Sequence, residues 1–313
     1  MTDDFILLLE LNLNKQSVYL SIITFLTLIL VNSFSCTFNP FSSNSGISNS
    51  KISGKVRFND GMNPKNVYVW LEGFELDTYT NEEGQFSITL PPADSQGMDG
   101  GFSGTYYLYF YHPNYIVDSL YVILANGRLS GDQDYLNRKG NLNDTVVLKK
   151  LIDLHISVVS INPLDLYNGK SDDDKLRVIM EFQTFDEIVT LRCRIWNKPF
   201  GSTTLLRRTG VFFQGNDAIS DFSYEYNHMD SFYYLYELQA DTTTIWKEFI
   251  LPLNPSEFKT GEYTIIPFAY PVQELPESLI RCMGENIITF HQDYLDFPIQ
   301  RNDCNYTVIG GNL

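Results

Sequence analysis

Apolar and polar residues alternate along most of this 313-residue chain, and this period-two pattern limits what the chain can fold into. The segment 51–58 (KISGKVRF) places Ile52, Val56 and Phe58 on one face and basic or hydroxyl side chains on the other. Similar runs follow at 66–74 (NVYVWLEGF) and 84–90 (GQFSITL), with Gly, Asn and Pro in the turns between them. Strands that bury one face against a core have this pattern. The pattern predicts an all-β chain.

The alternation resumes after residue 151 in seven segments: IDLHISVVSI, KLRVIMEF, EIVTLRCRIW, TGVFF, TTIWKEFILPL, GEYTIIPFAY and NIITFHQDYLDFPI. One short helix is expected at 275–284 (LPESLIRCMG), and FKTGEYTI (258–265) has the spacing of the tyrosine corner of immunoglobulin-like folds. We therefore expect two antiparallel β-sandwich domains, at 51–150 and 151–313, the second of them immunoglobulin-like.

An uncharged apolar segment, Ser17 to Val31, comes before the two domains. It is short for a bilayer span and suits the core of a signal peptide. Ser35 and Cys36 follow it and resemble the lipobox of bacterial lipoproteins, which implies that Cys36 is acylated after cleavage. An ordinary secretory signal and a single-span anchor remain alternatives. Residues 1–35 are thus expected to be a signal peptide or anchor, and the Ser- and Asn-rich residues 36–50 a flexible tether.

Charge and cysteine content narrow the function classes. The net charge of −16, with no stripe of Lys or Arg, argues against nucleic acid as a partner. Cys193 lies on the apolar side of its predicted strand and is expected to be a buried thiol. Cys282 and Cys304 lie in loop-like sequence and are candidates for a disulfide in an oxidising compartment.

The stretch Asn81-Glu82-Glu83-Gly84 has two interpretations. Its carboxylates are candidates for an acidic site, but Gly84 supplies the positive φ of a tight turn and Asn81 can bond to nearby backbone. Nothing in the sequence predicts a pocket that would shift the pKa of Glu82 or Glu83. A turn with both carboxylates in solvent is the favoured interpretation.

The order of motifs in the first half resembles that of the carboxypeptidase regulatory-like domain, a small sandwich of the transthyretin-like, carbohydrate-binding-like group. The motifs are Gly54-Lys55-Val56, Pro64 to Val69, Thr80 to Phe86, the aromatic strand Tyr106 to Tyr115, and a closing strand at 143–150. Asn114 stands where the family has glycine, and Asn tolerates left-handed geometry. The resemblance implies an accessory module without catalytic residues.

The aromatic strand of this segment also carries a candidate binding surface. Alternation puts Tyr107, Tyr109 and Tyr111 on the face away from the core. These rings can stack against sugars or a peptide. The favoured alternative is that they pack against the next domain or form cross-strand aromatic pairs.

Motifs for catalysis and metal binding are mostly missing. No histidine has a partner at a metal-ligand offset, and no nucleophile elbow, P-loop or dinucleotide fingerprint occurs. His155 is expected to face solvent. The best metal candidate is the acidic segment 165–174, where calcium is weighed against a solvated turn. Its oxygen ligands would be Asp165, Asn168, Asp172, Asp173 and Asp174.

These observations favour a non-enzymatic exported lipoprotein without a cofactor. It would be anchored to a membrane of the cell envelope, facing the periplasm or the exterior, and would bind a protein or glycan partner at the cell surface. The alternatives are an accessory subunit or hydrolase with a site in the second domain, and a purely structural spacer.

Overall fold

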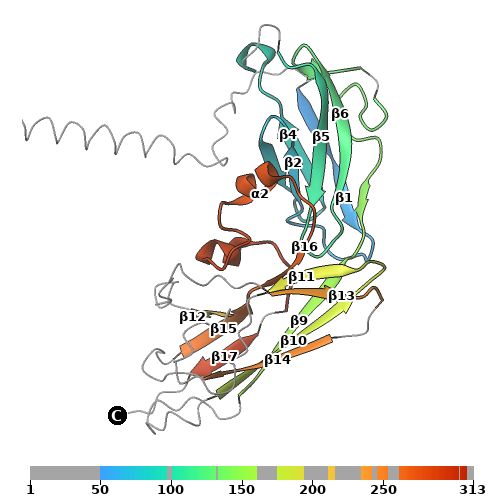
Figure 1. Ribbon diagram of the computed structural model, residues 1–313. Helices are drawn as coiled ribbons and strands as arrows, with labels where there is room; N and C mark the ends of the chain where they lie inside the picture. Colours follow the sequence, from blue (N-terminus) through green and yellow to red (C-terminus); the bar gives the residue numbers. More distant parts are fainter. Residues whose placement is uncertain are drawn as a thin grey trace, which may run out of the picture.

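The computed structural model describes residues 50–96, 101–131, 133–160, 175–193, 211–215, 234–241, 245–252, 261–302 and 304–308 (Figure 1). These residues form many short strands in several sheets, which confirms the expected all-β class. Among them the single α-helix is α2 (Glu277–Met283), inside the segment where the sequence predicts one. A short 3-10 turn, η1 (Ala93–Ser95), follows β4.

The first unit, made of the described residues between 51 and 150, is a sandwich of two sheets. One sheet has the order β4 (Gln85–Thr89), β1 (Lys51–Phe58), β8 (Val146–Leu148). The other has the order β3 (Leu76–Tyr79), β2 (Tyr68–Leu71), β5 (Gly104–Tyr111), β6 (Asp118–Ala125), β7 (Arg128–Leu129). Alternate residues such as Val56, Leu108 and Phe110 fill the core between them. The closing strand β8 runs parallel to β1, whereas the other pairs of this unit are antiparallel.

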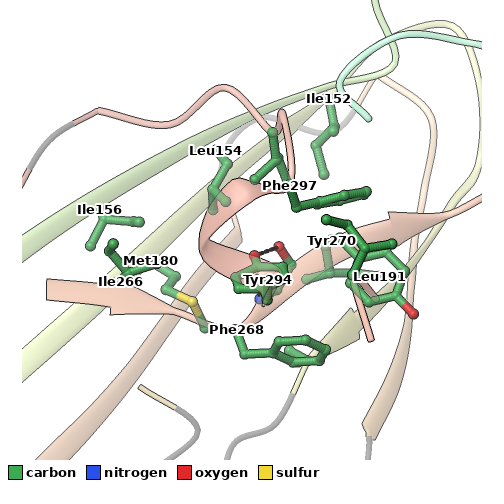
Figure 2. Packing of buried hydrophobic residues seen from close by; sticks show 14 of the residues in the cluster. Ile152, Leu154, Ile156, Met180, Leu191, Ile266, Phe268, Tyr270, Tyr294 and Phe297 are labelled. Atoms are coloured by element: carbon green, nitrogen blue, oxygen red, sulfur yellow. Dashed lines mark hydrogen bonds between the residues drawn. The ribbon is translucent and has the colours of Figure 1, made fainter. Parts of the chain in front are cut away.

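The described residues after 151 form the second unit, which has three three-stranded sheets. Their orders are β14 (Ile245–Pro252), β10 (Lys175–Thr184), β9 (Ile152–Ser160); β13 (Tyr234–Leu238), β11 (Val189–Cys193), β16 (Ala269–Val272); and β12 (Val211–Gly215), β15 (Gly261–Pro267), β17 (Asn305–Val308). Tyr294 and Phe268 lie in the middle of the aromatic and aliphatic core that these sheets share (Figure 2). Cys193 is fully buried in this core, as expected.

The segment NIITFHQDYLDFPI was predicted to be a strand, and the structure shows this to be wrong. Residues 286–299 form turns and the 3-10 helix η4 (Gln292–Asp296). The buried residues are Ile287, Phe290, Tyr294, Phe297 and Ile299, and the first four have the spacing of three and four residues that is typical of helical structure. The apolar positions therefore match a helical period at least as well as an alternating one.

Strand β2 was expected to be half buried but is buried on both faces. Val69 and Leu71 point into the first core, while Tyr68 and Trp70 belong to the core of the second unit. The residues that enclose them come from a covering segment, residues 273–300, which includes α2 and η4. Figure 1 shows α2 beside β2 although the two elements come from opposite ends of the described chain. The two units are thus joined by a common apolar cluster.

Two side-chain carboxamides fix the covering segment to the first unit. Asn114 donates to the carbonyl of Gln300 (2.9 Å) and accepts from its N–H (2.6 Å). Gln273 accepts from the N–H of Val117 (2.8 Å) and donates to the carbonyl of Tyr115 (2.9 Å). Each carboxamide therefore pairs with backbone as a neighbouring strand would. Asn114 does not have a positive φ. It therefore contributes to the structure through these hydrogen bonds and not through left-handed backbone geometry.

The acidic stretch after β3 is a tight turn, as favoured from the sequence. Gly84 has φ 76°, and the Asn81 side chain accepts from two backbone N–H groups of the turn. Glu82 lies in solvent and pairs with Lys65 at 2.6 Å. The turn does not close a hairpin, because β3 pairs with β2 and β4 pairs with β1. It carries the chain from one sheet to the other, and Val56 donates to the carbonyl of Gly84 at 2.8 Å.

Gly84→Ala should destabilise the protein more than Gly61→Ala. Both glycines have φ near 77°, but a Cβ on Gly84 would lie 2.1 Å from the carbonyl oxygen of Val56, whereas one on Gly61 would meet nothing within 4 Å. Gly61→Ala should cost about 1 kcal/mol for backbone strain alone, and Gly84→Ala about 3 kcal/mol or more. Urea unfolding of the two variants measures the difference. Equal costs would show that the contact with Val56 is not tight.

Candidate binding surfaces

The outer face of the five-stranded sheet carries most of the exposed aromatic side chains of the first unit. The register places Tyr68 opposite Tyr111 and Trp70 opposite Tyr109. On the other side of β5, Tyr107 lies opposite Tyr121 of β6. Residues directly opposite each other point to the same side of a sheet. The predicted ladder of Tyr107, Tyr109 and Tyr111 is therefore one row of a wider aromatic face.

The covering segment closes one half of this face. Tyr111 is buried in the second core and packs against Phe297 with ring centroids 6.4 Å apart. Burial of its hydroxyl raises the pKa of Tyr111 above its ordinary value. At the edge, Arg281 of α2 bonds to Glu75 at 3.2 Å. Tyr111 thus helps to join the two units. This is the alternative favoured from the sequence, in which the tyrosines pack against the next domain.

The other half of the face is open to solvent. We call it the tyrosine face, and it consists of Tyr107, Tyr109, Tyr121 and Tyr135. Tyr107 is 47% exposed and Tyr135 is 42% exposed, and the other two rings are half-buried. The rings of Tyr121 and Tyr135 meet edge to face at 5.0 Å, and those of Tyr107 and Tyr109 lie 6.2 Å apart.

Acidic groups border the tyrosine face. Tyr121 donates a hydrogen bond to Asp134, and this bond raises the pKa of the Tyr121 hydroxyl. Partial burial and the nearby Glu72 carboxylate raise the pKa of Tyr109. The hydroxyls of Tyr109 and Tyr121 therefore stay protonated at physiological pH. The face is aromatic and bordered by negative charge.

A polar groove lies over the other sheet of the first unit. Its volume is about 670 Å³. The floor consists of outward side chains of β1 and β4, and the walls are the segment 141–145 and the end of β3. Gly54 lets the segment 141–145 pack close to β1, since a Cβ at this position would lie 2.5 Å from the Leu142 side chain. The residues that line the groove include Lys51, Ser53, Lys55, Gln85, Ser87, Asn143 and Asp144.

A buried charged cluster lies where the first unit meets the second. The ammonium group of Lys150 is 3.1 Å from Asp60 and 2.6 Å from Asp153, and it lies over the ring of Tyr115. Burial acts to raise the pKa of Asp60, but the N–H of Met62 and the Lys150 ammonium outweigh it and hold this pKa below its usual value. The lowered pKa favours the carboxylate form of Asp60, so the cluster is built around an ion pair.

The imidazole of His112 packs beside this cluster against Phe58 and Tyr115. It is 1% exposed and its Nδ1 accepts from the N–H of Asn114. Burial, with help from the Lys150 charge, lowers the pKa of His112 to about 3. His112 is therefore a neutral core residue.

The candidate disulfide is not formed in the structure. Cys193, Cys282 and Cys304 all keep their thiols. Cys282 lies in α2 near Tyr68, whereas Cys304 lies just before β17 near the N–H of Val158. The two thiols thus have different neighbours, one beside the first unit and one inside the second. The loop between them is folded over the aromatic face without a covalent closure.

Several predicted site residues lie outside the described residues. Cys36 and the whole segment 1–49 are among them, and so are Asp165, Asn168, Asp172, Asp173 and Asp174. In the part of the chain that the structure describes, no three His, Cys, Asp or Glu side chains are grouped to hold a metal ion. His155 is exposed, as predicted. Residues 258–260 of the predicted tyrosine corner also lie outside, and Tyr263 is buried in β15.

No protein-family model matches this chain, and neither does any curated protein. Among solved structures, a Bacteroides uniformis protein proposed to bind carbohydrate is 11% identical with a TM-score of 0.28, over 69% of this chain and 87% of that protein. The major pilin subunit of Bacillus cereus is 9% identical with a TM-score of 0.21, over 53% of this chain and 44% of the pilin. The chain thus matches less than half of the pilin. These scores are too low for inference, so the fold rests on the strand topology.

The free energy of unfolding should decrease as the pH falls from about 6.5 to about 3. In this range the unfolded chain binds a proton at His112, whereas the folded chain, with the pKa of His112 lowered to about 3, does not. The loss should reach about 1.4 kcal/mol per pH unit from this group. Urea titrations of wild type and His112→Gln between pH 4 and 6 measure it as a difference in slope. The control His155→Gln should keep the wild-type slope, and an unchanged slope in His112→Gln would contradict the prediction.

Proposed function

We propose that this chain is a non-enzymatic binding module of the cell envelope, exported and held at a membrane by a lipid on Cys36. The lipobox-like Ser35-Cys36 after the apolar segment supports the anchor, and the Ser- and Asn-rich segment supports a tether. In the described part of the chain, no helix is both long and apolar enough to cross a bilayer. The order of strand motifs supports an accessory module of the carboxypeptidase regulatory-like kind.

The observation that carries the binding role is the tyrosine face. Four rings lie together on the outer face of the sheet, while the rest of the same aromatic face is used to join the two units. Tyrosine supplies large contact area at low entropic cost and is enriched at protein interfaces. The face suits a protein partner that offers an apolar or basic patch, because Glu72 and Asp134 border it.

A scaffold role has support of its own. The common apolar cluster and the two carboxamide pairs join the units. A module of this kind holds a partner at a set distance and angle from its anchor. Binding and scaffolding are compatible in one protein.

Replacing Tyr107 with a photo-crosslinking phenylalanine should give a discrete adduct in the native envelope. Tyr107 lies at the centre of the proposed contact, so adding Tyr121→Ala should reduce the adduct about ten-fold. Met62, 55% exposed at a turn outside the tyrosine face, provides the matched control position. Crosslinking is read by mass spectrometry. The same adducts at both positions, or none at Tyr107, would contradict a partner on this face.

Cys36→Ala should release the protein from the membrane fraction into the soluble fraction. Acylation needs the thiol of this residue, so the variant should also lack the mass of the lipid. Fractionation and intact mass spectrometry measure both effects. A wild-type protein that is membrane-bound and begins at Met1 would contradict the lipid anchor and favour an uncleaved span.

A further inference from the structure

We propose that the polar groove on the sheet β4-β1-β8 binds an acidic glycan, a sugar chain that carries carboxylates. The groove is separate from the tyrosine face, because it lies over the other sheet of the first unit. The inference therefore goes beyond the proposed function and does not depend on the partner of that face.

The lining has the chemistry that sugar hydroxyls require. Ser53, Gln85, Ser87 and Asn143 carry groups that can donate or accept, and more than half of the lining residues have hydroxyl or amide side chains. The outward positions of β1 and β4 supply this floor because alternate residues of each strand face solvent. At about 670 Å³ the groove is within the usual size range of ligand sites, roughly 300–1,000 Å³.

The charge of the groove selects an acidic chain. The protein has a net charge of −16, yet the groove is lined by Lys51 and Lys55 and by one carboxylate, Asp144. In the described residues, no carboxylate lies within ion-pair distance of either ammonium. The two lysines are four residues apart on one strand, about 13 Å at about 3.3 Å per residue. They therefore match carboxylates on separate sugars of one chain better than a single compact anion.

Other ligand classes fit the groove less well. A peptide cannot add to β1 as a strand, because β4 pairs along its first half, and residues 140–142 and then β8 pair on its other side. Arginine, the side chain that binds phosphate through paired bonds, is absent from the groove lining. An acidic protein of this size repels nucleic acid, which carries far more charge than two lysines neutralise.

Calorimetric titration of the purified protein with oligomers of galacturonate, alginate and hyaluronan tests the proposal. At least one should bind, and its affinity should decrease as salt is raised. Its methyl-esterified form, which has the same rings and hydroxyls without the charge, should bind at least ten-fold more weakly. Lys51→Gln with Lys55→Gln should weaken the acid form about ten-fold and leave the weak binding of the ester unchanged.

Matched variants distinguish binding in the groove from a general effect of the protein's charge. Lys139→Gln with Lys149→Gln removes the same charge from exposed positions outside the groove lining and should leave the affinity unchanged. No binding of any acidic oligomer at millimolar concentration would overturn the proposal. So would equal effects of the two lysine pairs, or competition by inorganic phosphate at the same concentration.

Discussion

The rest of the structure depends on the burial of Tyr68 and Trp70 against the second unit. Strand β2 sends Val69 and Leu71 into one core and Tyr68 and Trp70 into another. Each large aromatic side chain removes on the order of 150–250 Å² of its surface from water, so the two side chains form a strong hydrophobic contact between the units. A strand at this position cannot change its register without disturbing both cores. The two units are therefore held together by β2, a strand of the first unit that contributes side chains to both cores.

This arrangement divides the aromatic face into a structural and an open part. Tyr111 is covered by residues that come nearly two hundred positions later, and Asn114 and Gln273 hold that segment in place with paired backbone bonds. Tyr107, four residues earlier on the same strand and the same face, stays in solvent. The same row of residues thus joins the two units at one end and faces solvent at the other. The extent of the covering segment determines where the buried part of the row ends.

Sequence patterns predicted the features that local chemistry controls. The alternation gave strands at β1 and β4, Gly84 gave the turn, and 275–284 contained the helix. The double burial of β2 was not predictable, because the hydroxyl of Tyr68 and the indole N–H of Trp70 are compatible with a solvated face. Strand β6 was missed because DSLYVILA ends in a continuous apolar run, so Tyr121 did not join the predicted ladder. The groove combines three separate polar segments, each of which resembles ordinary surface until the sheets bring them together.

The position of β1 has a mechanical consequence. β1 is the central strand of its sheet, antiparallel to β4 on one side and parallel to β8 on the other, and it is the first strand of the first unit. If the chain is tethered from its N-terminal side, a pulling force enters the fold at Lys51 along the axis of this strand. Hydrogen bonds on both sides then carry the load in shear and must break together, while bonds at a sheet edge would open one at a time. Forced unfolding follows the unfolding barrier rather than equilibrium stability, so a central first strand would let the module stay folded while its partner is under tension.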